Sequence, residues 1–126
     1  ALGVLLADLD LDHDLDVYVA NDGVPNFIYR NEGGRFTDIS VISGADRNER
    51  GLPDGSMGLE AGDFNGDLLP DLWVSNYEQE SMALYRAHPG GFFQHVSQPM
   101  GVAGIGPVYV GWGMHLSDYD GDGDED

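Results

Sequence analysis

The most informative segment of the chain is Asp63-Phe64-Asn65-Gly66-Asp67-Leu68-Leu69-Pro70-Asp71, an acidic loop that leads into the apolar run Leu72-Trp73-Val74. Acidic clusters of the same form stand at residues 8–16 and 118–126, so the first residues are 55 positions apart both times (63 − 8 and 118 − 63). A glycine stands five residues before each cluster, at Gly3, Gly58 and Gly113. Self-similarity at a fixed period is the sequence signature of stacked structural units.

Each repeat reads as four short strands separated by turn residues. In the second repeat we expect strands near residues 58–62, 71–75, 82–87 and 92–96, with Gly-rich and polar turns between them. No stretch shows a sustained helical periodicity. Four-stranded antiparallel units with a period of about 50 residues are typical of a β-propeller. The sequence therefore predicts an all-β fold, a fragment of a β-propeller with two four-stranded blades plus the start of a third.

The predicted organisation follows from the repeat boundaries. Blade 1 covers about residues 3–40, a connection covers 41–57, blade 2 covers about 58–97, a second connection covers 98–112, and the third blade starts at 113–126. A propeller needs about 4 to 8 blades. We therefore expect the remaining blades of a parent propeller to be partners of this segment.

Charge and composition exclude several classes of function. The 126 residues include 23 Asp and Glu against 5 Lys and Arg, which gives a formal net charge of −18. Such a surface repels phosphate backbones, so we expect no nucleic-acid partner. No apolar run approaches the roughly 18–20 residues of a membrane span, so we expect no membrane insertion. The absence of Cys excludes Cys-ligated zinc and thiol catalysis.

The acidic clusters share the pattern D-x-[DN]-x-D-x-x-x-D, which suits a hard cation with oxygen ligands. Ca²⁺ takes about 6 to 8 such oxygens, and side chains at loop positions 1, 3, 5 and 9 can converge with the carbonyl of position 7. The candidate ligands are Asp8, Asp10, Asp12, the carbonyl of Asp14 and Asp16 in loop 1; Asp63, Asn65, Asp67, the carbonyl of Leu69 and Asp71 in loop 2; and Asp118, Asp120, Asp122, the carbonyl of Asp124 and Asp126 in loop 3. We expect two to three Ca²⁺ ions.

Other interpretations of the loops are weaker. An EF-hand needs a Glu at position 12 and flanking helices, whereas Val19 and Val74 stand there. Mg²⁺ remains possible, although it keeps more waters. A merely solvated acidic turn is disfavoured because its several carboxylates, within nine residues, would repel one another without a cation.

The three loops differ in their residues. Glycine at position 4 helps the backbone to curl in loops 2 and 3, whereas Leu11 in loop 1 leaves it less free. If loop 3 is complete, we expect loop 2, with only three carboxylates, to attract a cation less strongly than loop 3.

The segment 58–74 resembles the FG-GAP or VCBS repeat of integrin-α-type propellers. Segments 26–40, 83–86 and 107–113 look like the cartilage acidic protein group and its bacterial relatives, which carry ASPIC/UnbV domains. The resemblance implies a Ca²⁺ loop between the first two strands of each blade, held by the residues named above. It also implies an extracellular, periplasmic or cell-surface protein. Leu11, His13 and Leu68 depart from the usual glycine-containing loop.

Motifs for catalysis are missing from the sequence, which contains no G-x-S-x-G, Walker A or H-E-x-x-H pattern. The sequence favours a noncatalytic, calcium-binding propeller segment that serves extracellular ligand binding or adhesion, with an unknown protein or glycan as ligand. Two alternatives stay open: the chain belongs to a polysaccharide lyase or hydrolase with a propeller fold, or it is a purely structural spacer.

Two further features have expected roles. Residues 41–57 are a candidate partner-facing connection, and the recurring pairs Tyr29-Arg30 and Tyr85-Arg86 are expected to serve blade packing.

Overall fold

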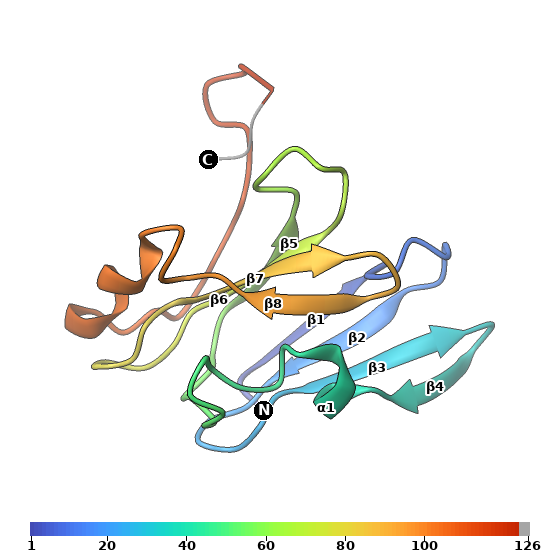
Figure 1. The fold of residues 1–126 in the computed structure, drawn as a ribbon, viewed down its shortest axis with the longest axis horizontal. Coiled ribbons are helices and arrows are strands. Elements are labelled where there is room, and N and C mark those ends of the chain that lie inside the picture. Colours follow the sequence, from blue (N-terminus) through green and yellow to red (C-terminus); the bar gives the residue numbers. More distant parts are fainter. Residues whose placement is uncertain (124–126) are drawn as a thin grey trace.

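Two antiparallel four-stranded sheets form the framework of the computed structural model, which describes residues 1–123 (Figure 1). The first sheet has the order β1 (Gly3–Ala7), β2 (Asp16–Ala20), β3 (Phe27–Glu32) and β4 (Arg35–Asp38). The second has the order β5 (Leu59–Gly62), β6 (Asp71–Val74), β7 (Ala83–His88) and β8 (Phe92–His95). Each strand pairs with the next along the chain, as in a blade of a propeller. The predicted all-β fold is confirmed.

The strands predicted for the second repeat agree with β5 to β8 to within one residue at each end. Glycine pairs stand at the hairpin turns because they readily adopt the left-handed backbone conformation that a tight hairpin requires. Gly33 and Gly34 join β3 to β4 with φ of +60° and +90°. Gly90 and Gly91, with φ of +87° and +72°, lie at the matching turn between β7 and β8.

Short helical turns occupy the two connections. The one-turn helix α1 (Ser40–Ser43) follows β4 and contacts both β3 of the first sheet and β8 of the second. Two 3-10 turns, η1 (Val102–Gly104) and η2 (Gly106–Val108), follow β8. Within the described part, residues 109–123 contain no strand, so the start of a third blade at 113–126 stays a prediction.

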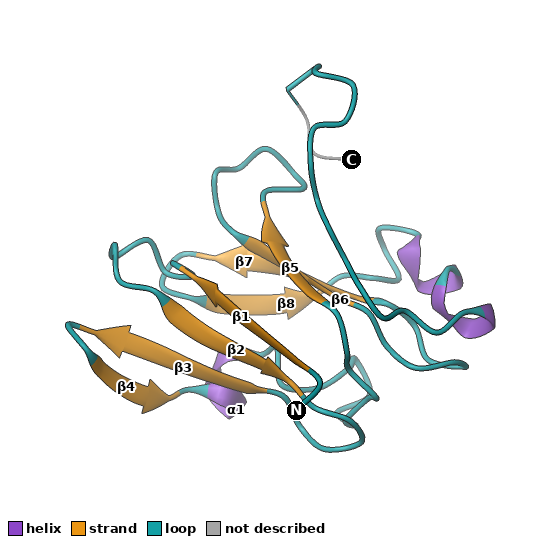
Figure 2. Ribbon diagram, turned by 180° about the vertical axis from the view of Figure 1, so that it is seen from behind, coloured by secondary structure: helices purple, strands orange, loops and turns teal. Residues whose placement is uncertain are grey.

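The hydrophobic core lies between the two sheets, which stack with β1 beside β5 (Figure 2). Alternation along β2 buries Tyr18 and Ala20 and leaves Val17 and Val19 half-buried. From the second sheet, Leu72, Val74 and Tyr85 fill the same cluster and are almost fully buried. Each sheet thus covers one face of the other. In a stack of blades this contact between neighbouring sheets is repeated from blade to blade.

The inner strands approach the following repeat closely, and glycine makes this approach possible. A Cβ on Gly3 would lie 2.2 Å from the carbonyl oxygen of Met57. A Cβ on Gly58 would lie 2.6 Å from Ser75 Oγ and 3.1 Å from the backbone of Gly113. The chain near Gly113 therefore crosses the second repeat much as the chain near Met57 crosses the first. Gly3 and Gly58, which stand before the first two acidic clusters, thus leave room for a close backbone contact that a side chain would block.

The outer face of the first sheet is apolar and uncovered. Val4, Leu6, Phe27 and Phe36 are 64%, 60%, 38% and 53% exposed, and the strand register places them on one face. The matching residues of the second sheet are packed in or against the core: Leu59, Ala61, Ala83 and Phe93. The face that the second sheet buries against the first is thus the face that the first sheet leaves open.

Candidate metal centres

The first six residues of all three acidic loops follow a similar backbone path. In each loop the first Asp accepts the backbone N–H groups of positions 5 and 6, and Asp118 also accepts the N–H of Gly121 at 2.6 Å. The N–H···O distances are 3.0 and 2.9 Å at Asp8, 3.0 and 2.7 Å at Asp63, and 3.0 and 3.0 Å at Asp118. The first carboxylate therefore organises the curl that surrounds its own oxygens.

Positions 4 and 6 of every loop adopt the left-handed backbone conformation. The φ values are 63° and 77° for Leu11 and His13, 74° and 65° for Gly66 and Leu68, and 78° and 98° for Gly121 and Gly123. The predicted advantage of glycine at position 4 therefore has a geometric basis. A non-glycine residue in this conformation costs about 1–2 kcal/mol, which the hydrogen bonds of the first Asp must offset.

Replacing Leu68 by Gly is expected to stabilise the chain by up to about 1 kcal/mol. The side chain of Leu68 is 83% exposed, so little packing is lost. Removing the left-handed strain outweighs the greater flexibility of Gly in the unfolded chain. Urea unfolding in the presence of EDTA measures the difference. The control is Leu52→Gly, an exposed position without a positive φ, where the same change should be neutral or destabilising. A destabilised Leu68→Gly variant would contradict the strain argument.

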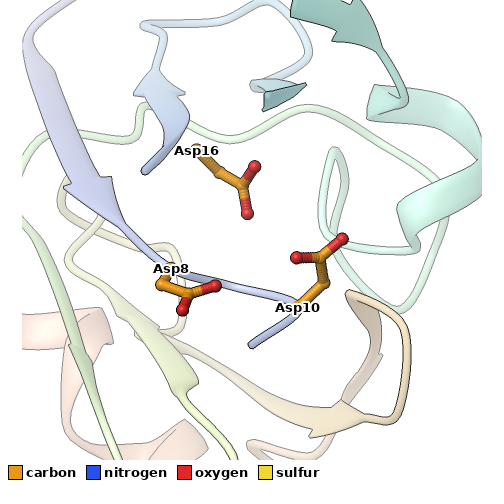
Figure 3. A group of neighbouring side chains, drawn as sticks. All are labelled: Asp8, Asp10 and Asp16. Carbon is orange, nitrogen blue, oxygen red and sulfur yellow. The ribbon is translucent and has the colours of Figure 1, made fainter. Parts of the chain in front are cut away.

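Loop 1 brings three carboxylates together at its centre. Asp8, Asp10 and Asp16 each offer one oxygen, and these oxygens all lie within 4.8 Å of one another. Figure 3 shows the three side chains pointing into a common space. Oδ1 of Asp10 is buried and has no hydrogen-bond partner, so it is an acceptor without a donor. A hard cation fits this site because it needs several oxygens close together, and Oδ1 of Asp10 is one that no donor occupies. The oxygens of Asp8 and Asp16 also accept backbone N–H groups.

In loops 1 and 2 the last Asp begins the second strand of its sheet and is almost completely buried. Asp16 is 2% exposed and accepts the N–H groups of Leu9 at 3.0 Å and Asn31 at 2.8 Å. Asp71 is 1% exposed and accepts the N–H of Ala87 at 2.6 Å. Each of these carboxylates therefore ties its loop to the third strand of the same sheet.

Burial makes the negative charge of these loops costly. Desolvation raises the pKa of Asp10, Asp16 and Asp71, and neighbouring carboxylates add to the effect. Hydrogen bonds from Leu9 and Asn31 oppose the shift at Asp16. A raised pKa means that the folded loop favours uptake of positive charge, whether a proton or a metal ion.

Loops 2 and 3 differ from loop 1 in their side chains. Nδ2 of Asn65 donates a hydrogen bond to Oδ2 of Asp71 at 3.0 Å, so the amide presents its donor rather than its oxygen to this carboxylate. In loop 3, Asp118, Asp120 and Asp122 form a second group with oxygens within 4.8 Å of one another, and all three are exposed. Within the part of the chain that the structure describes, loops 1 and 3 are the two that gather three carboxylates.

The remaining predicted ligands have other roles or lie elsewhere. Oδ1 of Asp12 accepts the N–H of Asp14 at 2.8 Å, and Oδ1 of Asp67 accepts the N–H of Leu69 at 3.1 Å. Oδ2 of Asp14 accepts the N–H of Gly33, which fastens loop 1 to the β3–β4 turn. Asp124 and Asp126 lie outside the described residues. The full ligand sets stay a prediction.

Two arginines reach the acidic loops, and the sequence analysis did not assign them there. Nε of Arg30 lies 3.0 Å from Oδ2 of Asp10, and a terminal nitrogen of Arg86 lies 3.2 Å from Oδ2 of Asp67. They occupy the same position of β3 and β7. The recurrence of Tyr-Arg at an offset of 56 residues was the signal that could have found them.

A separate polar cavity opens at the other end of the sheets. It has a volume of about 130 Å³ and is lined by the connection that contains Glu49 and Asp54, by Glu80 and by His95. Burial raises the pKa of Asp54 to about 6, with Glu80 and Glu49 adding to the shift. Burial lowers the pKa of His95. Residues from 48 to 54 of the connection 41–57 thus line this cavity, and the role of the connection in binding a partner stays a prediction.

The fold and the loops define a class: a repeat built of four-stranded antiparallel units, each with an acidic loop between its first two strands. A family model described as FG-GAP-like repeat matches residues 8–74 and 63–126. The chain belongs to the FG-GAP-like repeat family, and its sheets are blades of the β-propeller type. A search of curated proteins found no significant match. Among residues 1–123, no helix is long and apolar enough to cross a membrane.

Proposed function

We propose that the chain is a noncatalytic, calcium-binding segment of a β-propeller, with one ion in each acidic loop that is complete. The observation that carries this proposal is the buried, unpartnered Oδ1 of Asp10 beside the carboxylates of Asp8 and Asp16. Calcium supplies two positive charges to a loop whose burial disfavours its own negative charge. The ion would stabilise the β1–β2 and β5–β6 hairpins, because free energy of binding to the folded state alone is free energy of folding.

Calorimetric titration of the chain with Ca²⁺ tests this function. We expect two to three sites with Kd of about 0.1–1 mM, the range of extracellular calcium modules. Asp8→Asn and Asp63→Asn should each remove one site. Glu78→Gln, an exposed acid outside the loops, is the matched control and should leave all sites intact. Mg²⁺ should bind more weakly because it demands a more rigid geometry. Absence of saturable calcium binding would refute the proposal.

The proposed partners are of two kinds. Further blades of the same propeller would cover the apolar face formed by Val4, Leu6, Phe27 and Phe36, as the first sheet covers the matching face of the second. A protein or glycan ligand would bind at the end of the sheets opposite the metal loops, where residues 48–54 line the polar cavity. Loops at the end of a rigid sheet framework are common binding surfaces.

We further propose an extracellular, periplasmic or cell-surface location and a role in ligand binding or adhesion. Millimolar calcium outside the cell would fill sites of the affinity expected here. The resemblance of segments 26–40, 83–86 and 107–113 to the cartilage acidic protein group supports a place among proteins that carry ASPIC/UnbV domains.

A further inference from the structure

Arg30 connects the first acidic loop to the second sheet. Its Nε ion-pairs with Oδ2 of Asp10 at 3.0 Å, and a terminal nitrogen donates a hydrogen bond to the carbonyl of Gly90, in the turn between β7 and β8. The side chains of Arg30 and Asp10 are 23% and 11% exposed, so this pair is largely shielded from water. Shielded charge pairs are less screened by salt than surface pairs, so most of the attraction between Arg30 and Asp10 persists at physiological ionic strength.

The β7–β8 turn packs directly against this ion pair. A Cβ on Gly91, where φ is +72°, would lie 3.1 Å from Cβ of Asp10 and 3.2 Å from a terminal nitrogen of Arg30. The matching glycine of the first sheet, Gly34, has φ of +90°, and a Cβ there would meet nothing within 4 Å. The close approach at Gly91 is therefore specific to the junction between loop 1 and the second sheet.

The ion pair leaves one oxygen of Asp10 for the centre of the loop. Arg30 engages Oδ2, whereas Oδ1 is the buried oxygen without a hydrogen-bond partner. Nε of Arg30 makes no hydrogen bond, so charge attraction at 3.0 Å, with Arg30 anchored on the carbonyl of Gly90, favours the orientation of this carboxylate in which Oδ1 faces the loop. Arg86, at the same position of the second sheet, ion-pairs with Asp67 of its own repeat and is 48% exposed. Its partner stands at position 5 of loop 2, not at position 3 as Asp10 does in loop 1, and this exposed pair is screened by solvent.

We propose that the β7–β8 turn of the second sheet is part of the first metal site: it positions Arg30, which in turn positions Asp10 for the ion. This inference rests on the proposed calcium function. Loop 1 then binds Ca²⁺ at full strength only when the second sheet is packed beside it. By thermodynamic linkage, an ion in loop 1 strengthens the contact between the two sheets by the same free energy. Arg30 is a positioning residue here.

Gly91→Ala in the full chain tests the coupling, with Gly34→Ala as the matched control. Both changes place a side chain in the left-handed region, so both carry the same backbone cost. We expect Gly91→Ala to weaken calcium binding at loop 1 about tenfold, within the usual range of coupling between sites. Gly34→Ala should leave it unchanged. Calorimetry with Asp8→Asn as reference identifies the share of the heat that belongs to loop 1.

Arg30→Lys separates orientation from charge. Lysine keeps the positive charge but lacks the fork that reaches Asp10 and Gly90 together. We expect the same selective loss at loop 1, with loop 2 unchanged, whereas Arg86→Lys should leave loop 1 unchanged. Equal loop 1 affinity in Gly91→Ala and Gly34→Ala would overturn the coupling while calcium binding itself stands. If the unaltered chain binds no calcium at all, the proposed function fails instead.

Discussion

We expect removal of calcium to lower the melting temperature of the chain by about 10–20 °C. No other change proposed for this chain is expected to have a larger effect on its stability. An ion present at about 10 to 100 times its Kd adds about 1.4–2.7 kcal/mol per site to the stability of the folded state. Two filled loops therefore contribute about 3–5 kcal/mol. In a domain of this size each kcal/mol corresponds to about 3–5 °C. The melting temperature with EDTA, compared with that in about 10 mM CaCl2, which is about 10 to 100 times the expected Kd, gives the shift.

The control for this experiment addresses the net charge of −18, which any salt screens. NaCl at equal ionic strength should recover only a small part of the stability. A chain that carries both Asp8→Asn and Asp63→Asn should lose most of its response to calcium, because both described hairpin loops are disabled. The same melting temperature in EDTA and in calcium would show that the acidic loops are not sites of cation binding that stabilise the fold.

The features that sequence reasoning could predict are those whose determinants lie close together in the chain. The acidic loops place their oxygens within nine residues, and glycine pairs and alternating apolar residues mark the strands. The structure accordingly has β5 to β8 where the repeat pattern places them. The one-turn helix α1 was not predicted because four residues are too few to establish a helical period.

Contacts between repeats could not be predicted, since they depend on how the sheets stack. Arg30 and Gly90 are 60 residues apart, and the sequence around neither residue predicts the hydrogen bond between them. The left-handed φ of Leu11 and Leu68 is a second feature that the residue type does not predict. Leucine has no preference for this conformation, but the N–H groups that the first Asp accepts impose the curl on whichever residue stands there.

Asp71→Ala is expected to destabilise the chain by about 3–5 kcal/mol even in EDTA, because the carboxylate is a structural acceptor as well as a candidate ligand. Asp71 is 1% exposed. Its Oδ1 accepts the N–H of Ala87 at 2.6 Å, and its Oδ2 accepts Nδ2 of Asn65 at 3.0 Å. A buried N–H left without an acceptor costs about 1–3 kcal/mol, and the emptied space adds to this.

Urea unfolding in EDTA isolates this structural contribution from that of the metal. Asp71→Asn keeps one acceptor oxygen and removes the buried charge, so its loss should be about half as large or less. Asp67→Ala is the matched control in the same loop: its carboxylate is 28% exposed and pairs with Arg86, and such pairs contribute about 0–1 kcal/mol. Equal stability of Asp71→Ala and Asp67→Ala in EDTA would contradict this role. The carboxylate at position 9 would then matter only when an ion is bound, and the loops would depend on the metal for their shape.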